Sequence, residues 1–282
     1  MRKVKIVADT SADLFRLGKV DFASAPMKVI TAEREFTDDE SLDVDGMVEF
    51  LFKYKGKSKS SCPNVADWLE AFGDADDIFC VTITSGLSGS YNSACLAKKT
   101  YEASGDGKRV FVLDTLSAGP EMTLITEKLE EYILSGMEYC EICERITEYS
   151  QSTGLIFMLK SLRNFANNGR VSPIVAKLVG IAGICIVGKA SDVGTLEPMH
   201  KSRGERKSLD VLWDEIKSHG YDGGKVSIGH CANPEAAETI KSMILAEYPT
   251  AQVEAHKFRG LCSFYAEKGG LLVGFEKCKV DS

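Results

Sequence analysis

Hydroxyl side chains are concentrated in three segments that each follow a predicted strand: Asp9–Asp13, Thr82–Ser93 and Asp114–Gly119. Because the carboxyl ends of parallel strands form the ligand crevice of a doubly wound sheet, we expect these segments to share one edge. The middle segment places Ser88 between two glycines and leads into a predicted helix, whose first N–H groups favour an anion. Serine and threonine are also the usual helix N-caps, so the residues alone leave an anion site and ordinary capping evenly balanced.

Ser88 also raises the alternative of a serine-dependent esterase or acyl-transfer enzyme. A nucleophile elbow has the pattern G-x-S-x-G, whereas the sequence here reads Gly86-Leu87-Ser88-Gly89. A catalytic triad further needs a histidine, and none of the four histidines falls in a convincing partner loop. The histidines also lack the spacing of metal ligands, so we predict no metal site. Hydrolysis at Ser88 stays the alternative function.

Two further motifs resemble chemical sites but fit their surroundings better as plain structure. Cys140-Glu141-Ile142-Cys143 has zinc or redox spacing, yet it lies in a helical pattern and lacks a second cysteine pair. Gly183–Ala190 is close to the consensus sequence of a phosphate-binding loop, but its interior consists of β-forming residues and Ala190 replaces the metal-binding hydroxyl. We therefore expect a helix at the first motif and a strand at the second.

The composition disfavours several classes of protein. Of the 282 residues, 44% are hydrophobic and 27% are charged, which is typical of a globular chain and not of a disordered one. Acidic residues outnumber basic ones by 41 to 34, and this balance disfavours a nucleic acid as partner. The nine scattered cysteines, with no signal-peptide pattern and no long apolar stretch, predict a reduced, cytoplasmic protein that makes only transient membrane contact.

Strands and helices alternate over the first half of the chain. Apolar runs predict strands buried on both faces at Val4–Ala8, Ile78–Ile83, Val110–Leu113 and Leu155–Leu159. Amphipathic patterns predict helices at Val44–Tyr54, Val65–Phe72, Ser88–Tyr101 and Pro120–Leu134. Alternation of this kind indicates a parallel sheet with helices on both of its faces.

The second half of the chain has a different order of elements. We predict strands at Ile184–Val187, Gly194–Lys201, Val226–Gly229, Val253–His256 and Leu271–Phe275. Helices are predicted at Glu205–Ser218 and Pro234–Tyr248. The fold class is therefore α/β, with an N-terminal parallel-sheet domain over residues 1–158 and a smaller α+β domain over residues 159–282, its helices on one face. The length, near the limit for a single core, agrees with two lobes.

Five short motifs, taken together and in order, resemble those of the DegV family. Asp9–Leu14 is similar to the family's opening D-S-x-A-D-L, and Ser60–Asn64 to its T-S-x-P-S. Leu87–Ala94 resembles L-S-G-T-Y-x-S-A. Leu162-Arg163 with Gly169–Val171 resembles L-x-x-L-x-x-G-R-I, and His230–Pro234 resembles S-H-A-x-N-P. The resemblance covers essentially the whole chain.

This resemblance implies a two-domain protein that binds one long-chain fatty acid between its lobes, without a cofactor and without catalysing a reaction itself. Members of the FakB type present the fatty acid to a separate fatty-acid kinase, which phosphorylates the carboxylate to an acyl phosphate. The apolar residues of Leu155–Leu159 and Ile174–Ile186 could line the acyl tunnel or belong to the core. A role in fatty-acid transport or metabolism is therefore expected.

The resemblance also implies roles for single residues. Ser60 and Ser88 would hold the carboxylate by hydroxyl hydrogen bonds, which are strong when the acceptor is charged. The remaining residues implied at the headgroup are Arg170, Ser61, Gly89 and Ser90. Tyr265 stands where the family has a histidine and could donate through its hydroxyl. Arg203, in a basic run, would contribute to kinase docking, and Cys62 is an unusual residue within its motif.

Overall fold

The first half of the chain forms a four-stranded parallel sheet. The structure, a computed structural model, describes residues 2–104, 107–171, 175 and 183–278. The strand order is β2-β1-β6-β7, with bounds Asp21–Ala25, Val4–Asp9, Asp77–Thr82 and Arg109–Asp114. Helices α2 (Val65–Phe72) and α3 (Ser90–Glu102) pack on one face, and α4 (Pro120–Leu134) and α5 (Tyr139–Gln151) on the other. The predicted parallel sheet with helices on both faces is confirmed.

The second half forms a six-stranded mixed sheet. Its strand order is β10-β9-β8-β13-β11-β12, with bounds Leu196–Arg203, Ile184–Ala190, Thr153–Leu159, Leu271–Glu276, Val226–His230 and Val253–Lys257. Helices α8 (Glu205–Ser218) and α9 (Pro234–Glu247) cover one face. On the other face lies α10 (Gly260–Ala266), a helix that was not predicted from the sequence. The expectations of a smaller sheet and of helices on one face only are therefore wrong.

Strand β8 corrects a second expectation. The segment Leu155–Leu159 was expected in the parallel sheet, but β8 pairs antiparallel with β9 and with β13. A central strand is buried on both faces in either kind of sheet, so its apolar run does not reveal its partners. A boundary after residue 158 would divide β8, whereas one before Thr153 would keep the strand with its sheet. The division of the chain into two domains stays a prediction.

A small third sheet lies beside the two larger ones and was also missed. It consists of β4 (Glu35–Thr37), β3 (Lys28–Ile30) and β5 (Lys59–Ser61), joined through helix α1 (Val44–Lys53). Its strands have only three residues each, too few to give a hydrophobic period. Phe264 of α10 packs against this unit, in a cluster with Val29, Met47 and Leu51.

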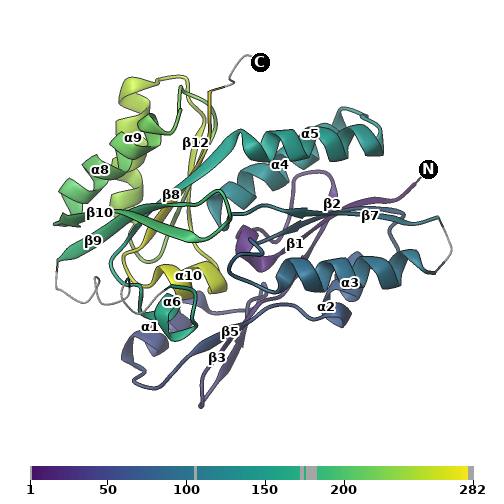
Figure 1. Cartoon of the computed structure of the whole chain (residues 1–282), viewed down its shortest axis with the longest axis horizontal. Helices are drawn as coiled ribbons and strands as arrows, with labels where there is room; N and C mark the ends of the chain where they lie inside the picture. Colours follow the sequence, from purple (N-terminus) through teal and green to yellow (C-terminus); the bar gives the residue numbers. More distant parts are fainter. Residues whose placement is uncertain (1, 105–106, 172–174, 176–182, 279–282) are drawn as a thin grey trace.

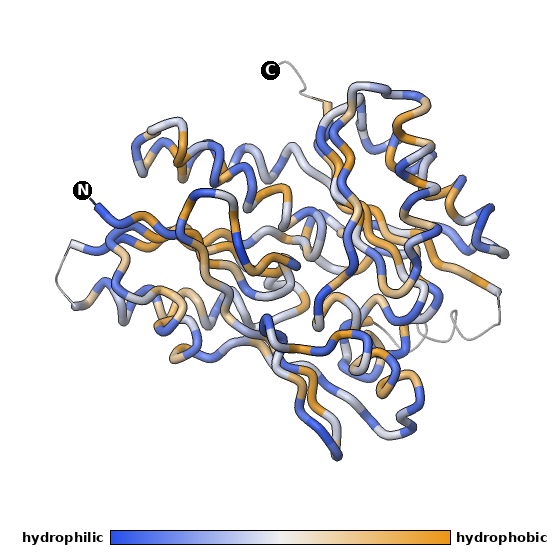
Figure 2. Tube along the Cα trace, turned by 180° about the vertical axis from the view of Figure 1, so that it is seen from behind, coloured by the Kyte–Doolittle hydropathy of each residue, from blue (hydrophilic) through white to orange (hydrophobic). Residues whose placement is uncertain are grey.

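The three sheets meet around α10, which Figure 1 shows near the middle of the molecule. The short helices η1 (Thr10–Ala12) and α6 (Arg163–Asn167) flank the same region. Figure 2 shows the most hydrophobic segments along the strands of the two large sheets, where the main clusters of buried residues lie. Helix α10 and the short helices beside it therefore lie where residues from all three sheets come close together.

The motifs discounted in the sequence occupy ordinary elements. Gly183 is followed by β9, and Cys140 and Cys143 lie in α5, as expected. Over the described ranges, no three His, Cys, Asp or Glu side chains are grouped so that they could hold a metal ion. None of the helices in the described part of the chain is long and apolar enough to cross a membrane.

Candidate functional site

A cavity of about 280 Å³ lies between the two large sheets, near the lower end of the range for small-molecule sites. Most of its wall is apolar: Leu87 and Leu116 come from loops of the first half, and Leu155, Phe157 and Leu159 come from β8. The segments after β6 and β7 contribute, as predicted from their place at the strand ends, whereas the third predicted segment, Asp9–Asp13 after β1, does not line the cavity. Most of Ile174–Ile186 lies outside the described residues, so its predicted place in the tunnel wall is not tested.

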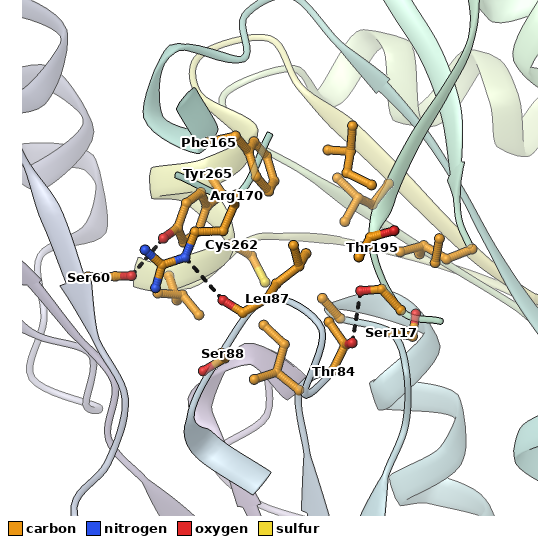
Figure 3. Close-up of a pocket in the computed structure, with 18 of the residues that line it drawn as sticks. Ser60, Thr84, Leu87, Ser88, Ser117, Phe165, Arg170, Thr195, Cys262 and Tyr265 are labelled. Carbon is orange, nitrogen blue, oxygen red and sulfur yellow. Dashed lines mark hydrogen bonds between the residues drawn. The ribbon is translucent and has the colours of Figure 1, made fainter. Parts of the chain in front are cut away.

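Polar groups gather at one end of this cavity. Figure 3 shows Ser60, Ser88, Arg170 and Tyr265 together, and Ser61 lines the cavity as well. Gly89 is also part of the wall. Six of the seven predicted headgroup residues therefore line one cavity, although they come from four separate parts of the sequence.

The hydroxyls at the other end of the cavity are engaged by the protein itself. Thr84 donates to the carbonyl of Gly194 at 2.8 Å, and the Thr195 hydroxyl lies 2.8 Å from that of Ser191. Ser117 donates to the carboxylate of Glu121. Because these hydroxyls already have partners, this end offers a ligand mainly apolar surface.

Ser60 and Tyr265 contact each other directly, although they lie 205 residues apart. Their hydroxyl oxygens are separated by 2.7 Å, which joins β5 to α10 (Figure 3). Burial raises the pKa of Tyr265, so its phenol stays protonated and able to donate a hydrogen bond. The ring of Phe165 lies 4.7 Å from that of Tyr265, centroid to centroid, and limits its movement.

Arg170 brings a positive charge to the same end. Its Nε donates to the carbonyl of Leu87 at 3.1 Å, and its Nη1 donates to the carbonyl of Asn168. No carboxylate of the described residues forms an ion pair with Arg170. The guanidinium is thus held by neutral carbonyls, and its charge is available to an anionic ligand in the cavity.

Ser88 is oriented by the first turn of α3, which begins at Ser90, two residues later than predicted. The backbone N–H of Ser90 donates to the Ser88 hydroxyl oxygen at 3.2 Å, so the Ser88 hydrogen can point to another acceptor. Gly89 allows the close approach of Cys62, because a Cβ there would lie 3.3 Å from the Cys62 sulfur. Burial raises the pKa of Cys62, which keeps this cavity-lining thiol protonated.

Ser90 does not line the cavity, contrary to its predicted contact role. It is fully buried, and its hydroxyl donates to Asp9 Oδ2 at 2.6 Å. The same carboxylate accepts from the N–H of Ile83 at 2.9 Å and from Ser11. Burial raises the pKa of Asp9, against these hydrogen bonds. Ser90 therefore acts on the site indirectly, by tying the loop that carries Ser88 to β1.

Two asparagines of the α6 region position the headgroup residues and were missed in the sequence. Asn168 Oδ1 accepts from the N–H of Ser60 at 3.2 Å, and its Nδ2 donates to the Ser58 carbonyl at 3.2 Å. Asn164 Nδ2 donates to the carbonyl of Phe264 at 2.7 Å, next to Tyr265. The available signal was their spacing of four residues, which places both amides on one side of a helical turn.

The beginning of α10 is held by two buried carboxylates from the first half of the chain. Asp38 accepts from the N–H groups of Gly260 and Leu261, at 2.9 and 2.7 Å. Asp13 accepts from the N–H of Arg259 at 2.8 Å, and burial raises the pKa of Asp13 to about 8. His256 Nε2 lies 4.0 Å from Asp13 Oδ2, and burial lowers the pKa of His256 to about 4. These contacts fix the helix that presents Tyr265.

Neither a histidine that could activate Ser88 nor Arg203 lies at the cavity, among the residues that the structure describes. None of the histidines described lines the cavity, and both His200 and His219 contact Glu215 on α8. Arg203 is exposed at the end of β10 and does not line the cavity. Its role in docking a partner stays a prediction.

Comparison with known proteins agrees with this architecture. A model of the DegV family, described as an uncharacterised protein, matches residues 3–277. The chain belongs to the DegV family. A DegV domain-containing protein of Streptococcus pneumoniae is 41% identical over 276 residues, which cover 96% of this chain and 98% of that protein.

Two solved structures are especially similar to this chain. One is a DegV family protein from Eubacterium eligens loaded with heptadecanoic acid, with 43% identity and a TM-score of 0.95, covering 98% of this chain and 100% of the other. The other is the Streptococcus pneumoniae fatty acid kinase (Fak) B3 protein loaded with linoleic acid, with 41% identity, a TM-score of 0.96 and the same coverage. The resemblance expected from the motifs is confirmed.

Proposed function

We propose that this DegV family protein binds one long-chain fatty acid in the cavity between its two large sheets. The observation that supports this most directly is the division of the cavity into an apolar body and a single polar end. Ser60, Ser88 and Tyr265 supply hydroxyl donors at that end, and Arg170 supplies a positive charge. This combination suits a ligand with one carboxylate and a long hydrocarbon chain.

The two parts of the ligand contribute differently. Burial of each methylene stabilises the complex by about 0.8 kcal/mol, so a long chain provides most of the affinity. Hydrogen bonds from Ser60 and Ser88 fix the direction in which the chain enters, because only the polar end satisfies a carboxylate. Ser61 and Gly89 shape the wall beside the carboxylate, and Ser90 holds the loop in place.

We further propose that the protein presents the bound carboxylate to a separate fatty-acid kinase, and that it catalyses no reaction itself. Its similarity to the Fak B3 protein supports this role, and a carrier of this kind needs no metal or cofactor. Arg203, exposed at the end of β10, is our candidate for kinase docking. A cytoplasmic location with transient membrane contact belongs to the same proposal.

Mass spectrometry of the purified protein tests the binding function. We expect a mass increase of one fatty acid under native conditions and none after denaturation. Ser88→Ala should lower the occupancy, whereas Ser85→Ala should not, because Ser85 is exposed in the same loop and does not line the cavity. A ligand of another class, or an empty protein that takes up no fatty acid after delipidation, would contradict the proposal.

The same measurement separates the carrier from the alternative enzyme. A serine-dependent esterase or acyl-transferase would leave an acyl adduct on Ser88 that survives denaturation. The carrier predicts an unmodified Ser88 and no turnover of ester substrates. No histidine of the described residues lines the cavity, which supports the carrier.

A further inference from the structure

One aromatic side chain in the apolar wall occupies an unusual position. Phe157 of β8 lines the cavity and is only 4% exposed. Across the sheet its neighbours are Gly188 on β9 and Leu272 on β13. A Cβ at Gly188 would lie 2.5 Å from Phe157 Cζ, closer than real atoms approach. The ring therefore lies over the backbone of Gly188, in space that only a glycine leaves free.

The place of Phe157 along the cavity follows from the direction of β8. Leu159, at the end of the strand, precedes α6, whose Phe165 contacts Tyr265 at the polar end. Leu155 lies at the opposite end of the strand, beyond Phe157. Successive residues of a strand are about 3.3 Å apart, so Phe157 lies roughly 7 Å along β8 from Leu159, towards Leu155. It therefore flanks the middle of the space that the proposed acyl chain occupies.

Glycine and phenylalanine face each other elsewhere in the same sheet, so the pairing alone is ordinary packing. A Cβ at Gly154 would lie 3.0 Å from Phe275 Cζ, and a Cβ at Gly229 would likewise meet the ring of Phe258. Neither Phe275 nor Phe258 lines the cavity. The pair at Gly188 differs because its ring forms part of the ligand's wall, where its position changes the room for a ligand.

We infer that Phe157, seated against Gly188, sets the length and bulk of the acyl chain that the cavity accepts. The inference rests on the proposed fatty-acid binding. With the ring seated against Gly188 of β9, the chain can pass from the polar end towards Leu155. A ring raised into the cavity would close this path beyond Leu159, and removal of the ring would widen it. Phe157 thus determines specificity and does not contact the carboxylate.

A chain-length series tests this inference. Delipidated wild type and Phe157→Ala are titrated with saturated acids of twelve to twenty carbons and with a branched acid, and the relative affinities are compared. Each additional methylene that can be seated should raise affinity by about fourfold. We expect Phe157→Ala to shift the preference by about tenfold towards the longest and branched acids, the equivalent of one to two methylenes.

Two further variants make the result decisive. Phe275→Ala removes the same ring from a pair outside the cavity, and its chain-length profile should match that of the wild type. Gly188→Ala should shift the preference towards short acids, with circular dichroism used to confirm folding, because the new methyl would also meet the Glu197 carbonyl.

The outcomes separate the two proposals. A wild type that binds fatty acids while Phe157→Ala keeps its profile would refute the role of Phe157 and leave the proposed function intact. The same holds if Phe275→Ala shifts the profile equally. A wild type that binds no fatty acid would overturn both.

Discussion

Asp13 provides the sharpest test of how the two halves of the chain are joined. Its side chain is fully buried, and burial raises its pKa from 3.8 to about 8. The folded protein therefore binds a proton on Asp13 more tightly than the unfolded chain does. The contribution of Asp13 to stability is complete below pH 4, and it is lost as the pH rises towards 8. The difference of about 4 between the pKa of Asp13 in the folded protein and in the unfolded chain corresponds to roughly 5 kcal/mol. This is a large part of the stability of a domain.

Asp13→Asn isolates this contribution. An asparagine can still accept from the Arg259 N–H through Oδ1, but it never carries a charge. Its amide can also turn to His256 Nε2, which has no hydrogen-bond partner among the described residues. Between pH 5 and pH 9 the wild type should lose stability that the variant keeps. The difference in the free energy of unfolding, variant minus wild type, should therefore rise by several kcal/mol over this range, and by about 5 kcal/mol at most.

Urea unfolding of both proteins at pH 5, 7 and 9 measures the effect. Asp192→Asn is the matched control, because Asp192 is an exposed aspartate and its replacement should leave the pH profile unchanged. Acids remote from Asp13 titrate in all three proteins and cancel in the comparison, whereas Asp38 is coupled to Asp13 by charge and its titration is part of the measured difference. Parallel pH profiles for the wild type and Asp13→Asn would refute the reasoning, since they would mean that Asp13 is already ionised in the folded protein at pH 5.

Three shorter predictions concern the site. Tyr265→Phe removes the hydroxyl that contacts Ser60, so the dissociation constant for a fatty acid, measured by titration, should rise roughly fivefold to tenfold. A smaller rise would contradict a role of Tyr265 at the headgroup. Asn168→Ala removes the amide that holds the strand carrying Ser60, so the free energy of unfolding should fall by about 1–3 kcal/mol and the thermal midpoint with it. The affinity for a fatty acid should fall as well, and an unchanged affinity would count against a positioning role. Gly194→Ala places a methyl against the Thr84 side chain and a non-glycine residue at the φ of +71° that Gly194 adopts. The free energy of unfolding in urea should therefore fall by about 2 kcal/mol or more, and an unaltered value would contradict the close packing.

Most helices were predictable because local signals define them. Pro120–Leu134 and Glu205–Ser218 have the predicted bounds, since an apolar stripe runs along each and a proline or glycine marks the start of the helix. The sheet membership of β8 was not predictable, because burial on both faces is common to parallel and central antiparallel strands. The three-residue strands of the small sheet are stabilised by α10 and α1, and their sequence carries no period of its own.

The candidate site was predictable to the extent that short motifs mark it. Ser60, Ser88 and Arg170 line the cavity, but the motifs gave no sign that Ser60 would meet Tyr265 from a distant helix. Asn168 acts through its amide on a neighbouring backbone, a tertiary contact that no local pattern encodes. The residues that line the polar end could thus be found from the sequence. The groups that position them could not, because they depend on how the sheets pack together.

The hydrogen bond between Ser60 and Tyr265 has a consequence for the release of a ligand. When a carboxylate occupies the polar end, both hydroxyls can donate to it. When the carboxylate leaves, the two hydroxyls form a hydrogen bond with each other, with 2.7 Å between their oxygens. The empty pocket therefore keeps fewer unsatisfied polar groups than two isolated hydroxyls would leave. This lowers the free-energy cost of emptying and so limits how tightly the headgroup is held. In the carrier proposed above, a moderate affinity at the headgroup would keep the delivery of the fatty acid reversible.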